Sequence, residues 1–320
     1  MIAKRLSDLV GNTPILELDQ ERYEIPENVH IYLKLESMNP GTSVKDRTVS
    51  YMFDKLEESG RLKPGGTVID ANAGNTGVAL AWLGAERGYK IVLVLPEDYI
   101  IEKQIMCRAL GAEIIHVPCC PDHAQTDAAV EKYLSEHPDA YYFDQYENPL
   151  NTEVHYEVTG PELYKQLDGK IDIFMHGAGT GGTFTGVAKY LKEQNDAVQA
   201  IIVQPEGSVY SGGKFRSFAC SGIGNSFIPG NLDLDIADEI VDVNQQQIDS
   251  TLWTVAEKSG LLIGQATGAH VFAAVEKAKT MAGQEEKNVV ILATDDSWKY
   301  FTKNIFDTQD WMDAKNRLVK

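Results

Sequence analysis

Residues 171–191 have the sequence IDIFMHGAGTGGTFTGVAKYL, and this stretch indicates the architecture of the whole chain. Its first part is apolar and β-branched, its middle is rich in glycine, and its last part repeats apolar residues at helical spacing. It therefore predicts a strand, a tight turn and a helix. Such a turn points several backbone N–H groups at one anion, so a phosphate binds well there. The residues expected at this phosphate site are Gly179, Thr180, Gly181, Gly182 and Thr183.

The same alternation of strand and helix extends in both directions from this stretch. Apolar, β-branched runs separated by helical patterns are HIYLKLE, TVIDA, KIVLVLP, EIIHVP, AYYFDQY, AIIVQPE, EIVDVN and NVVILAT. This pattern predicts an α/β fold with parallel sheets covered on both faces. A chain of 320 residues exceeds one domain of about 150 residues, so we expect two lobes, with a boundary near residues 148–152.

The composition narrows the classes of partner. Acidic residues outnumber basic ones by 47 to 29, giving a formal net charge of −18, so no nucleic acid and no membrane partner is expected. An anionic ligand then needs a locally prepared site. The N-terminus has no signal-peptide pattern, no run reaches the length of a membrane span, and there are only four cysteines, so we expect a cytoplasmic protein.

A lysine lies at the start of a second predicted helix, in the segment NPGTSVKDR of residues 39–47. Ser43 is a suitable N-cap for a helix that continues through Leu56, which places Lys45 in the first turn. The positive end of the helix lowers the pKa of this amine, and a neutral amine attacks aldehydes. Considered alone, the segment favours the alternative of a solvated lysine that pairs with Asp46.

Two further turns carry polar side chains ahead of helices. In DANAGNTGVAL, Asn72, Asn75 and Thr76 offer amides and a hydroxyl to a carboxylate, although a simple loop and N-cap is an alternative. In GLLIGQATGAHVF, the polar candidates are Thr267 and His270, with a helix cap and a surface histidine as the alternatives.

Two rival interpretations remain open at this stage. Gly177, Gly179 and Gly182 satisfy G-x-G-x-x-G, and Glu206 follows at the spacing of a ribose-binding acid, which also fits an NAD-dependent dehydrogenase. The segment HVPCCPDH contains side chains that bind zinc, but its spacing fits no standard site, so no metal is expected. The residues of that segment are His116, Cys119, Cys120 and His123.

Together the segments resemble the cysteine synthase and cystathionine β-synthase family of fold-type II pyridoxal-phosphate enzymes. The motifs that carry the resemblance are GNTPILEL, NPGTSVKDR, AGNTG, GAGTGGT and GIGNSFIP, in this order, and it extends from Gly11 to about Tyr300. It implies two doubly wound α/β lobes, tryptophan synthase β-like, with pyridoxal 5'-phosphate in the cleft between them. The large cofactor-binding lobe would comprise residues 1–45 and 151–320, and residues 46–150 would form a smaller mobile lobe. The resemblance also implies a homodimer.

The resemblance assigns roles to individual residues. Lys45 would form an imine with the cofactor and move the α-proton, Asn75 would hydrogen-bond the cofactor's ring oxygen, and Gly179 to Thr183 would hold the phosphate. The loop that closes on the substrate carboxylate would comprise Asn72, Ala73, Asn75 and Thr76, with help from Gln145.

The implied activity is that of a lyase or transferase which performs β-replacement on a small amino acid. As in a cysteine synthase, O-acetylserine and sulfide would give cysteine and acetate through an aminoacrylate. The alternative is consumption of cysteine with release of hydrogen sulfide, in which water or a thiol enters to form serine, lanthionine or cystathionine. A regulator that binds an amino acid without turnover is the non-enzyme alternative.

The sequence departs from the family pattern at three places. The substrate loop reads N-A-G-N-T-G where T-S-G-N-T-G is usual. The usual S-S-G is replaced by Ala266, Thr267 and Gly268, so we expect the Thr267 hydroxyl to face the pyridine nitrogen. The usual G-E-R-Y near the C-terminus is S-W-K-Y, ending at Tyr300.

Overall fold

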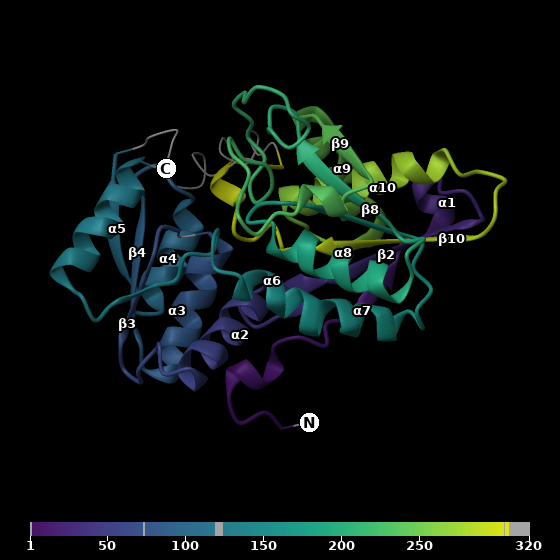
Figure 1. Ribbon diagram of the computed structural model, residues 1–320. Coiled ribbons are helices and arrows are strands. Elements are labelled where there is room, and N and C mark those ends of the chain that lie inside the picture. Colours follow the sequence, from purple (N-terminus) through teal and green to yellow (C-terminus); the bar gives the residue numbers. More distant parts are fainter. Residues whose placement is uncertain (1, 73, 119–123, 304, 307–320) are drawn as a thin grey trace.

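Figure 1 shows a computed structural model of the chain, which describes residues 2–72, 74–118, 124–303 and 305–306. Ala73, Cys119, Cys120 and His123, which the sequence analysis considered, lie outside these residues. Within the described ranges, no helix combines the length and the apolar character needed to cross a membrane.

The strands form two separate sheets. The larger has the order β1-β2-β10-β7-β8-β9 and is parallel except where β1 pairs with β2. The smaller is parallel with the order β5-β4-β3-β6. The strands of the larger sheet are β1 (Ile15–Glu17), β2 (Val29–Leu35), β7 (Ile173–Gly177), β8 (Gln199–Pro205), β9 (Glu239–Val243) and β10 (Lys287–Ala293). Those of the smaller sheet are β3 (Thr67–Asp70), β4 (Lys90–Pro96), β5 (Glu113–Val117) and β6 (Tyr141–Tyr142).

Helices connect the parallel strands, as the alternating pattern predicted. The α-helices are α1 (Gln20–Tyr23), α2 (Lys45–Glu58), α3 (Asn75–Arg87), α4 (Ile101–Ala109), α5 (Ala124–Glu136), α6 (Leu150–Val154), α7 (Gly160–Gln166), α8 (Gly182–Gln194), α9 (Gln245–Ser259) and α10 (Gln265–Lys279). Single turns of other helix types are the π-helical turn η3 (His155–Thr159) and the 3-10 turns η1 (Leu6–Leu9), η2 (Glu36–Met38), η4 (Leu234–Ile236) and η5 (Phe301–Lys303).

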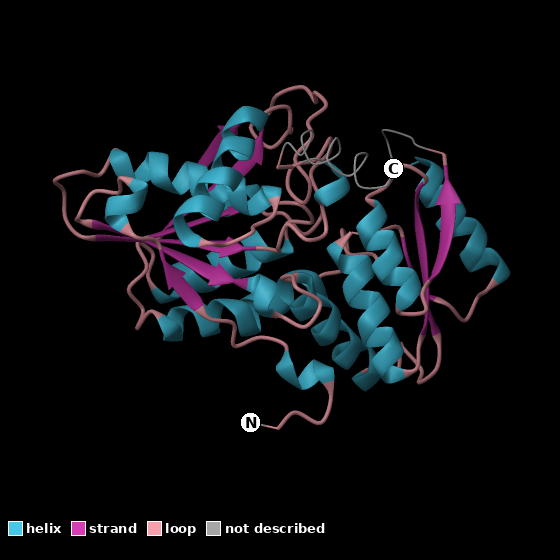
Figure 2. Cartoon of the chain, turned by 180° about the vertical axis from the view of Figure 1, so that it is seen from behind, coloured by secondary structure: helices cyan, strands magenta, loops and turns pink. Residues whose placement is uncertain are grey.

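Both sheets are covered on both faces, as the view from behind also shows (Figure 2). In β10, Val289 and Ile291 pack with α9 and α10, whereas Val290 and Leu292 pack with α7 and α8. Along β4, every second side chain packs against α2 and α3 on one face of the smaller sheet, and the side chains between them pack against α5 on the other face. Because side chains alternate along a strand, these runs are apolar throughout. The predicted fold class, two doubly wound α/β units, is confirmed.

The carboxyl ends of the parallel strands carry the loops from which the predicted site residues come. The turn after β7 leads into α8, and the loop after β3 leads into α3. The segment before α2 lies beside the end of β10, since Val44 donates its N–H to the Thr294 carbonyl at 2.9 Å and Ser43 bridges Asp295. Ligands bind at this edge of parallel sheets.

Candidate active site

A cavity of about 210 Å³ lies at the carboxyl ends of the parallel strands. Loops that follow strands of both sheets contribute to its wall. It brings together most of the residues that the sequence analysis predicted. The predicted residues that line it are Lys45, Asn72, Asn75, Thr76, Gln145, Gly179, Thr180, Gly181 and Thr183. Gly182 and Thr267 are not among the lining residues, and Ala73 lies outside the described ranges. Glu206, the acid required by a dinucleotide site, is exposed and does not line the cavity.

Lys45 begins α2, in the first turn as predicted, with its N–H 3.3 Å from the Ser43 hydroxyl. Its Nζ donates to the Thr180 hydroxyl at 3.3 Å. Burial lowers the pKa of Lys45 to about 8, an effect that Asp70 partly opposes. Asp46 does not pair with this lysine, because its carboxylate accepts from the Gly41 N–H at 2.7 Å and from Trp82 Nε1 at 2.8 Å. The solvated ion pair was therefore the wrong alternative.

The glycine-rich turn leads directly into α8, and two of its glycines are fixed by their surroundings. Gly181 has φ +89°, a backbone conformation that favours glycine, and a Cβ there would lie 2.6 Å from Leu232. A Cβ on Gly182 would lie 2.6 Å from the Asn151 carbonyl. The packing of the turn against neighbouring protein atoms therefore requires glycine at both positions. The turn lines the cavity, and its role as a phosphate site stays a prediction.

Side chains of the turn are held by buried groups. Thr180 Oγ1 accepts from Asn151 Nδ2 at 2.9 Å, and Thr183 Oγ1 lies 3.1 Å from His155 Nε2. Burial holds the pKa of His155 well below its usual value, and the neighbouring Lys45 lowers it further. A neutral imidazole can orient the Thr183 hydroxyl without adding charge.

The loop after β3 presents amides and a hydroxyl across the cavity from this turn. Thr76 donates its hydroxyl to Gln145 Oε1 at 2.6 Å, and Gln145 Nε2 lies 3.4 Å from the Asp70 carboxylate. The Asn75 amide donates to Asp295 Oδ2 at 2.8 Å, and its oxygen lies 3.4 Å from Lys299 Nζ. Burial, reinforced by Asp144, raises the pKa of Asp70 to about 8.

Thr267 lies behind the cavity wall, where it is fully buried. Its hydroxyl accepts from the Thr294 N–H at 3.0 Å and lies 3.4 Å from the Thr294 hydroxyl. Thr294 and Ala266 are the residues of this region that line the cavity. The proposed contact between Thr267 and a ring nitrogen therefore stays a prediction, with Thr294 as a second candidate.

His270 is buried, so its interpretation as a surface histidine was wrong. The Gly177 N–H donates to His270 Nε2 at 2.7 Å, and Nδ1 lies 3.0 Å from the Leu292 carbonyl. The neighbouring His176 lines the cavity, and its Nδ1 has no hydrogen-bond partner in the described residues. Burial, with a contribution from His270, holds the pKa of His176 well below its usual value. Both imidazoles are therefore neutral at pH 7.

Several cavity residues were not foreseen. Lys103 lies on α4, in a segment that the sequence marked only as a helix, and no local signal distinguishes it. Asp295 could have been found, because it lies two residues after the apolar run of β10 and hence close to a strand end. Tyr300 had been noted only as part of a departure from the family pattern.

Comparisons with known proteins agree on one kind of protein. The family model described as "Pyridoxal-phosphate dependent enzyme" matches residues 6–295. The chain is 41% identical to an O-acetylserine dependent cystathionine β-synthase of Bacillus subtilis, over 94% of this chain and 97% of that protein. It is 37% identical to a cysteine synthase of Staphylococcus aureus, over 95% and 97% of the two chains. The crystal structure of O-acetylserine dependent cystathionine β-synthase from Helicobacter pylori superposes with a TM-score of 0.90 at 36% identity, covering 96% of this chain and 99% of that one.

Proposed function

Since the chain belongs to the family of pyridoxal-phosphate dependent enzymes, we propose that it replaces the β-substituent of a small amino acid by a sulfur nucleophile. The donor in this proposal is O-acetylserine, and the group that leaves is acetate. The nucleophile is sulfide, as in a cysteine synthase, or a thiol. The observation that carries the proposal is the meeting of Lys45 Nζ with the Thr180 hydroxyl, opposite the first turn of α3, in one cavity.

The residues present fit pyridoxal 5'-phosphate. A glycine-rich turn opens onto the cavity at the start of α8, two threonine hydroxyls flank it, and an amine of lowered pKa lies beside it. Gly179 has no room for a side chain, because a Cβ there would contact the Gly222 carbonyl. His176, whose Nδ1 has no hydrogen-bond partner among the described residues, also lines this cavity. When bound, the cofactor supplies an electron sink for the negative charge that develops on the substrate's α-carbon.

Lys45 is the residue that holds the cofactor and moves the proton at the substrate's α-carbon. A pKa of about 8 is well below that of an ordinary lysine and leaves part of the amine neutral at physiological pH, which suits both the nucleophile and the base. The positive end of α2 and the burial of the Lys45 side chain both lower the pKa of its amine. Gly179 to Thr183 and the adjacent backbone would hold the phosphate.

The loop of Asn72, Ala73, Asn75 and Thr76, with Gln145, would bind the substrate carboxylate. Thr76 already donates its hydroxyl to Gln145 Oε1 at 2.6 Å, so these two side chains are positioned before substrate arrives. Closure of the smaller lobe, residues 46–150, over the larger lobe, residues 1–45 and 151–320, would exclude water from the reacting atoms.

The proposal includes a cytoplasmic homodimer. Two of the four cysteines, Cys107 and Cys220, are buried free thiols, which is the form that a reducing compartment maintains. Gel filtration with light scattering tests the dimer, and cell fractionation tests the location.

Product analysis tests the reaction. The purified holoenzyme is offered O-acetylserine with hydrosulfide, O-acetylserine with homocysteine, and cysteine alone. We expect acetate from the first two mixtures, together with cysteine from the first and the thioether cystathionine from the second. Absence of acetate from both would contradict the proposal. Rapid release of hydrosulfide from cysteine alone would favour the cysteine-consuming alternative.

A further inference from the structure

Part of the cavity wall is not used by any of the roles described above. It contains Lys103 from α4, and Asp295 and Tyr300 from the segment after β10. All three side chains are at least nine-tenths buried, although two of them carry charge and the third is polar. Buried charges are costly unless they are paired, so their presence requires a reason.

The three side chains form a chain of hydrogen bonds. Lys103 Nζ donates to the Tyr300 hydroxyl at 2.8 Å and lies 4.0 Å from the centroid of its ring. The Tyr300 hydroxyl in turn donates to Asp295 Oδ2, which also accepts from Asn75 Nδ2 at 2.8 Å. The hydroxyl therefore separates an ammonium from a carboxylate, and its orientation is fixed by both.

Each end of this chain of hydrogen bonds can form further hydrogen bonds. An ammonium has three N–H groups, yet among the described residues Lys103 has one acceptor and no carboxylate within ion-pair distance. The second oxygen of Asp295, Oδ1, accepts no hydrogen bond from the described residues. Burial lowers the pKa of Lys103 to about 8, which still leaves it mainly charged at pH 7.

A ligand with one carboxylate and one ammonium would complete both ends. Hydrosulfide carries a single charge and cannot satisfy the two groups together. The α-carboxylate and α-amino groups of a free amino acid carry the required pair of charges on the same α-carbon. The loop from Asn72 to Thr76 is already assigned to the carboxylate of the donor amino acid. Lys103 and Asp295 therefore suit a second amino acid.

We propose that Lys103 and Asp295 bind the incoming nucleophile, which is an amino-acid thiol with its own carboxylate and ammonium groups. This inference rests on the β-replacement proposed above and names its second substrate. In the overall reaction the sulfur lone pair forms a C–S bond to the β-carbon, and the C–O bond breaks with its electron pair on acetate. The thiol proton is balanced by the protonation of acetate, so no oxidant or reductant is needed.

The test crosses enzyme variants with matched nucleophiles. Homocysteine is compared with its decarboxylated analogue, which keeps the thiol and the amine, in wild type and in Lys103→Met. We expect the wild type to prefer homocysteine in kcat/KM and the variant to lose roughly tenfold to a hundredfold of this preference, the effect of a hydrogen bond to a charged group. Lys103→Arg, which keeps the charge, should retain the preference.

Lys299→Met is the matched control. Lys299 is equally buried but donates to the Gly41 and Thr42 carbonyls at 3.0 and 2.9 Å, and it does not line the cavity. This variant should leave the preference for homocysteine unchanged, whatever it does to the rate. Asp295→Asn, assayed with the deaminated analogue, tests the ammonium end in the same way.

Two results would overturn the inference. One is a preference for the carboxylate that survives in Lys103→Met, and the other is an equal loss with both nucleophiles, which would indicate only a structural role. A burst of acetate from O-acetylserine without any thiol separates the two proposals. If acetate is released but homocysteine is not used, the nucleophile subsite is wrong; if no acetate is released, the β-replacement itself is wrong.

Discussion

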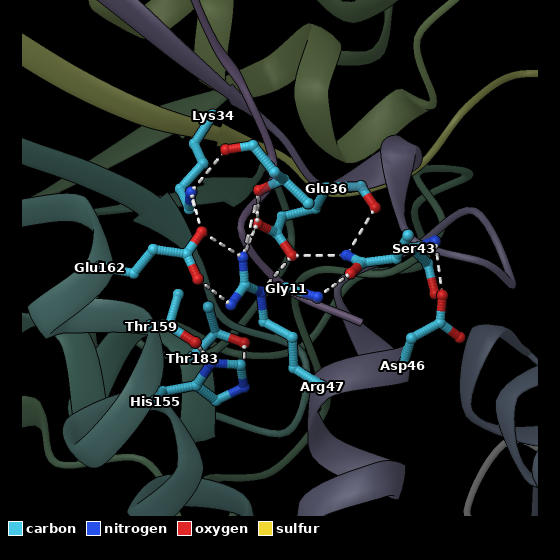
Figure 3. A network of polar contacts seen from close by, with 12 residues as sticks. Gly11, Lys34, Glu36, Ser43, Asp46, Arg47, His155, Thr159, Glu162 and Thr183 are labelled. Carbon is cyan, nitrogen blue, oxygen red and sulfur yellow. Dashed lines mark hydrogen bonds and ion pairs between the residues drawn. The ribbon is translucent and has the colours of Figure 1, made fainter. Parts of the chain in front are cut away.

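Two buried networks in this protein use similar side chains but differ in how completely they are paired. We call the first the arginine network; Figure 3 shows it in close view. Arg47 donates to Glu36 through Nε at 2.6 Å and Nη2 at 2.9 Å, and to Glu162 through Nη1 at 2.8 Å and Nη2 at 2.9 Å. We call the second, at the cavity, the lysine network. Its members are Asn75, Lys103, Asp295, Lys299 and Tyr300.

The lysines of the two networks make the difference plain. Lys34 Nζ donates to Glu162 and Gln166 at 2.5 and 2.7 Å and to the Thr13 carbonyl at 3.1 Å, so its three N–H groups have three acceptors. Lys103, which lines the cavity, has one acceptor among the described residues, whereas Lys299 of the same network, which does not line it, has three. A buried network with all its hydrogen bonds formed stiffens the structure, whereas a partly satisfied one keeps donors or acceptors that a ligand can use. The comparison teaches that pairing, rather than burial or charge, separates scaffold from site.

Lys45 is the extreme case of incomplete pairing, and its replacement should have the largest effect. Lys45→Ala should give a folded protein without covalently held cofactor, so the visible absorption band disappears. Turnover should fall by more than about a thousandfold, because the attachment and the base are lost together. Borohydride fixation followed by peptide mapping locates the attachment in wild type. Attachment at Lys103 instead would reverse the roles of the two cavity lysines.

Arg47→Met should break the satisfied network. It leaves the buried Glu36 and the half-buried Glu162 without their main partner, which costs about 3–5 kcal/mol of unfolding free energy. Lys103→Met should cost about 1 kcal/mol or less, since a poorly paired charge is removed together with one hydrogen bond. Urea unfolding of the two holoenzymes measures the difference. Equal losses would show that pairing does not distinguish the networks.

The sequence predicted the fold well because the spacing of apolar residues and the positions of glycines are local properties of the chain. The alternating apolar residues of β10 and the glycine-rich turn before α8 can be read without knowing what packs against them. The same holds for Lys45, whose position follows from a turn and a helix start.

The rest of the site depends on contacts between segments far apart in the chain. Lys103 and Tyr300 are 197 positions apart, and neither has a neighbour in sequence that predicts their hydrogen bond. Thr267 shows a related limit of the sequence. Its place in a motif predicts a contact with the cofactor ring, and only the structure shows that its hydroxyl also accepts a hydrogen bond from the Thr294 N–H. A helix position alone does not tell which side chain of a pair faces the cavity.

The two threonines can be separated by valine substitutions, which keep the shape and remove the hydroxyl. Thr294→Val should lower turnover roughly tenfold to a hundredfold and shift the cofactor absorption, because this hydroxyl belongs to a cavity residue. Thr267→Val should lower stability by about 1–3 kcal/mol, because the buried Thr294 N–H loses its acceptor. If instead Thr267→Val alone shifts the absorption, Thr267 is the ring partner that the sequence predicted.

The smallest effect concerns two carboxyl groups. One is Glu162 of the arginine network, and the other is Asp70, which contacts the cavity-lining Gln145. Although burial opposes it, hydrogen bonds from Arg47 and Lys34 hold the pKa of Glu162 at about 2. Burial raises the pKa of Asp70 to about 8, since a distant amide of Gln145 is its only side-chain hydrogen bond in the described residues. Full pairing and partial pairing have thus moved two carboxyl groups in opposite directions.

These shifts predict opposite dependences of stability on pH. A raised pKa in the folded state contributes stability below about pH 4, and this contribution is lost as the pH rises toward 8. Asp70→Asn removes the titration, so between about pH 5 and 7 its unfolding free energy should gain on wild type by at most about 1.4 kcal/mol per pH unit. Glu162→Gln should run parallel to wild type over this range, because the stability from a lowered pKa is lost only as the pH falls toward 2. Unfolding of the three holoenzymes at several pH values measures the slopes. A parallel line for Asp70→Asn would mean that Asp70 is ionised in the folded protein, and that the cavity side is better paired than its hydrogen bonds indicate.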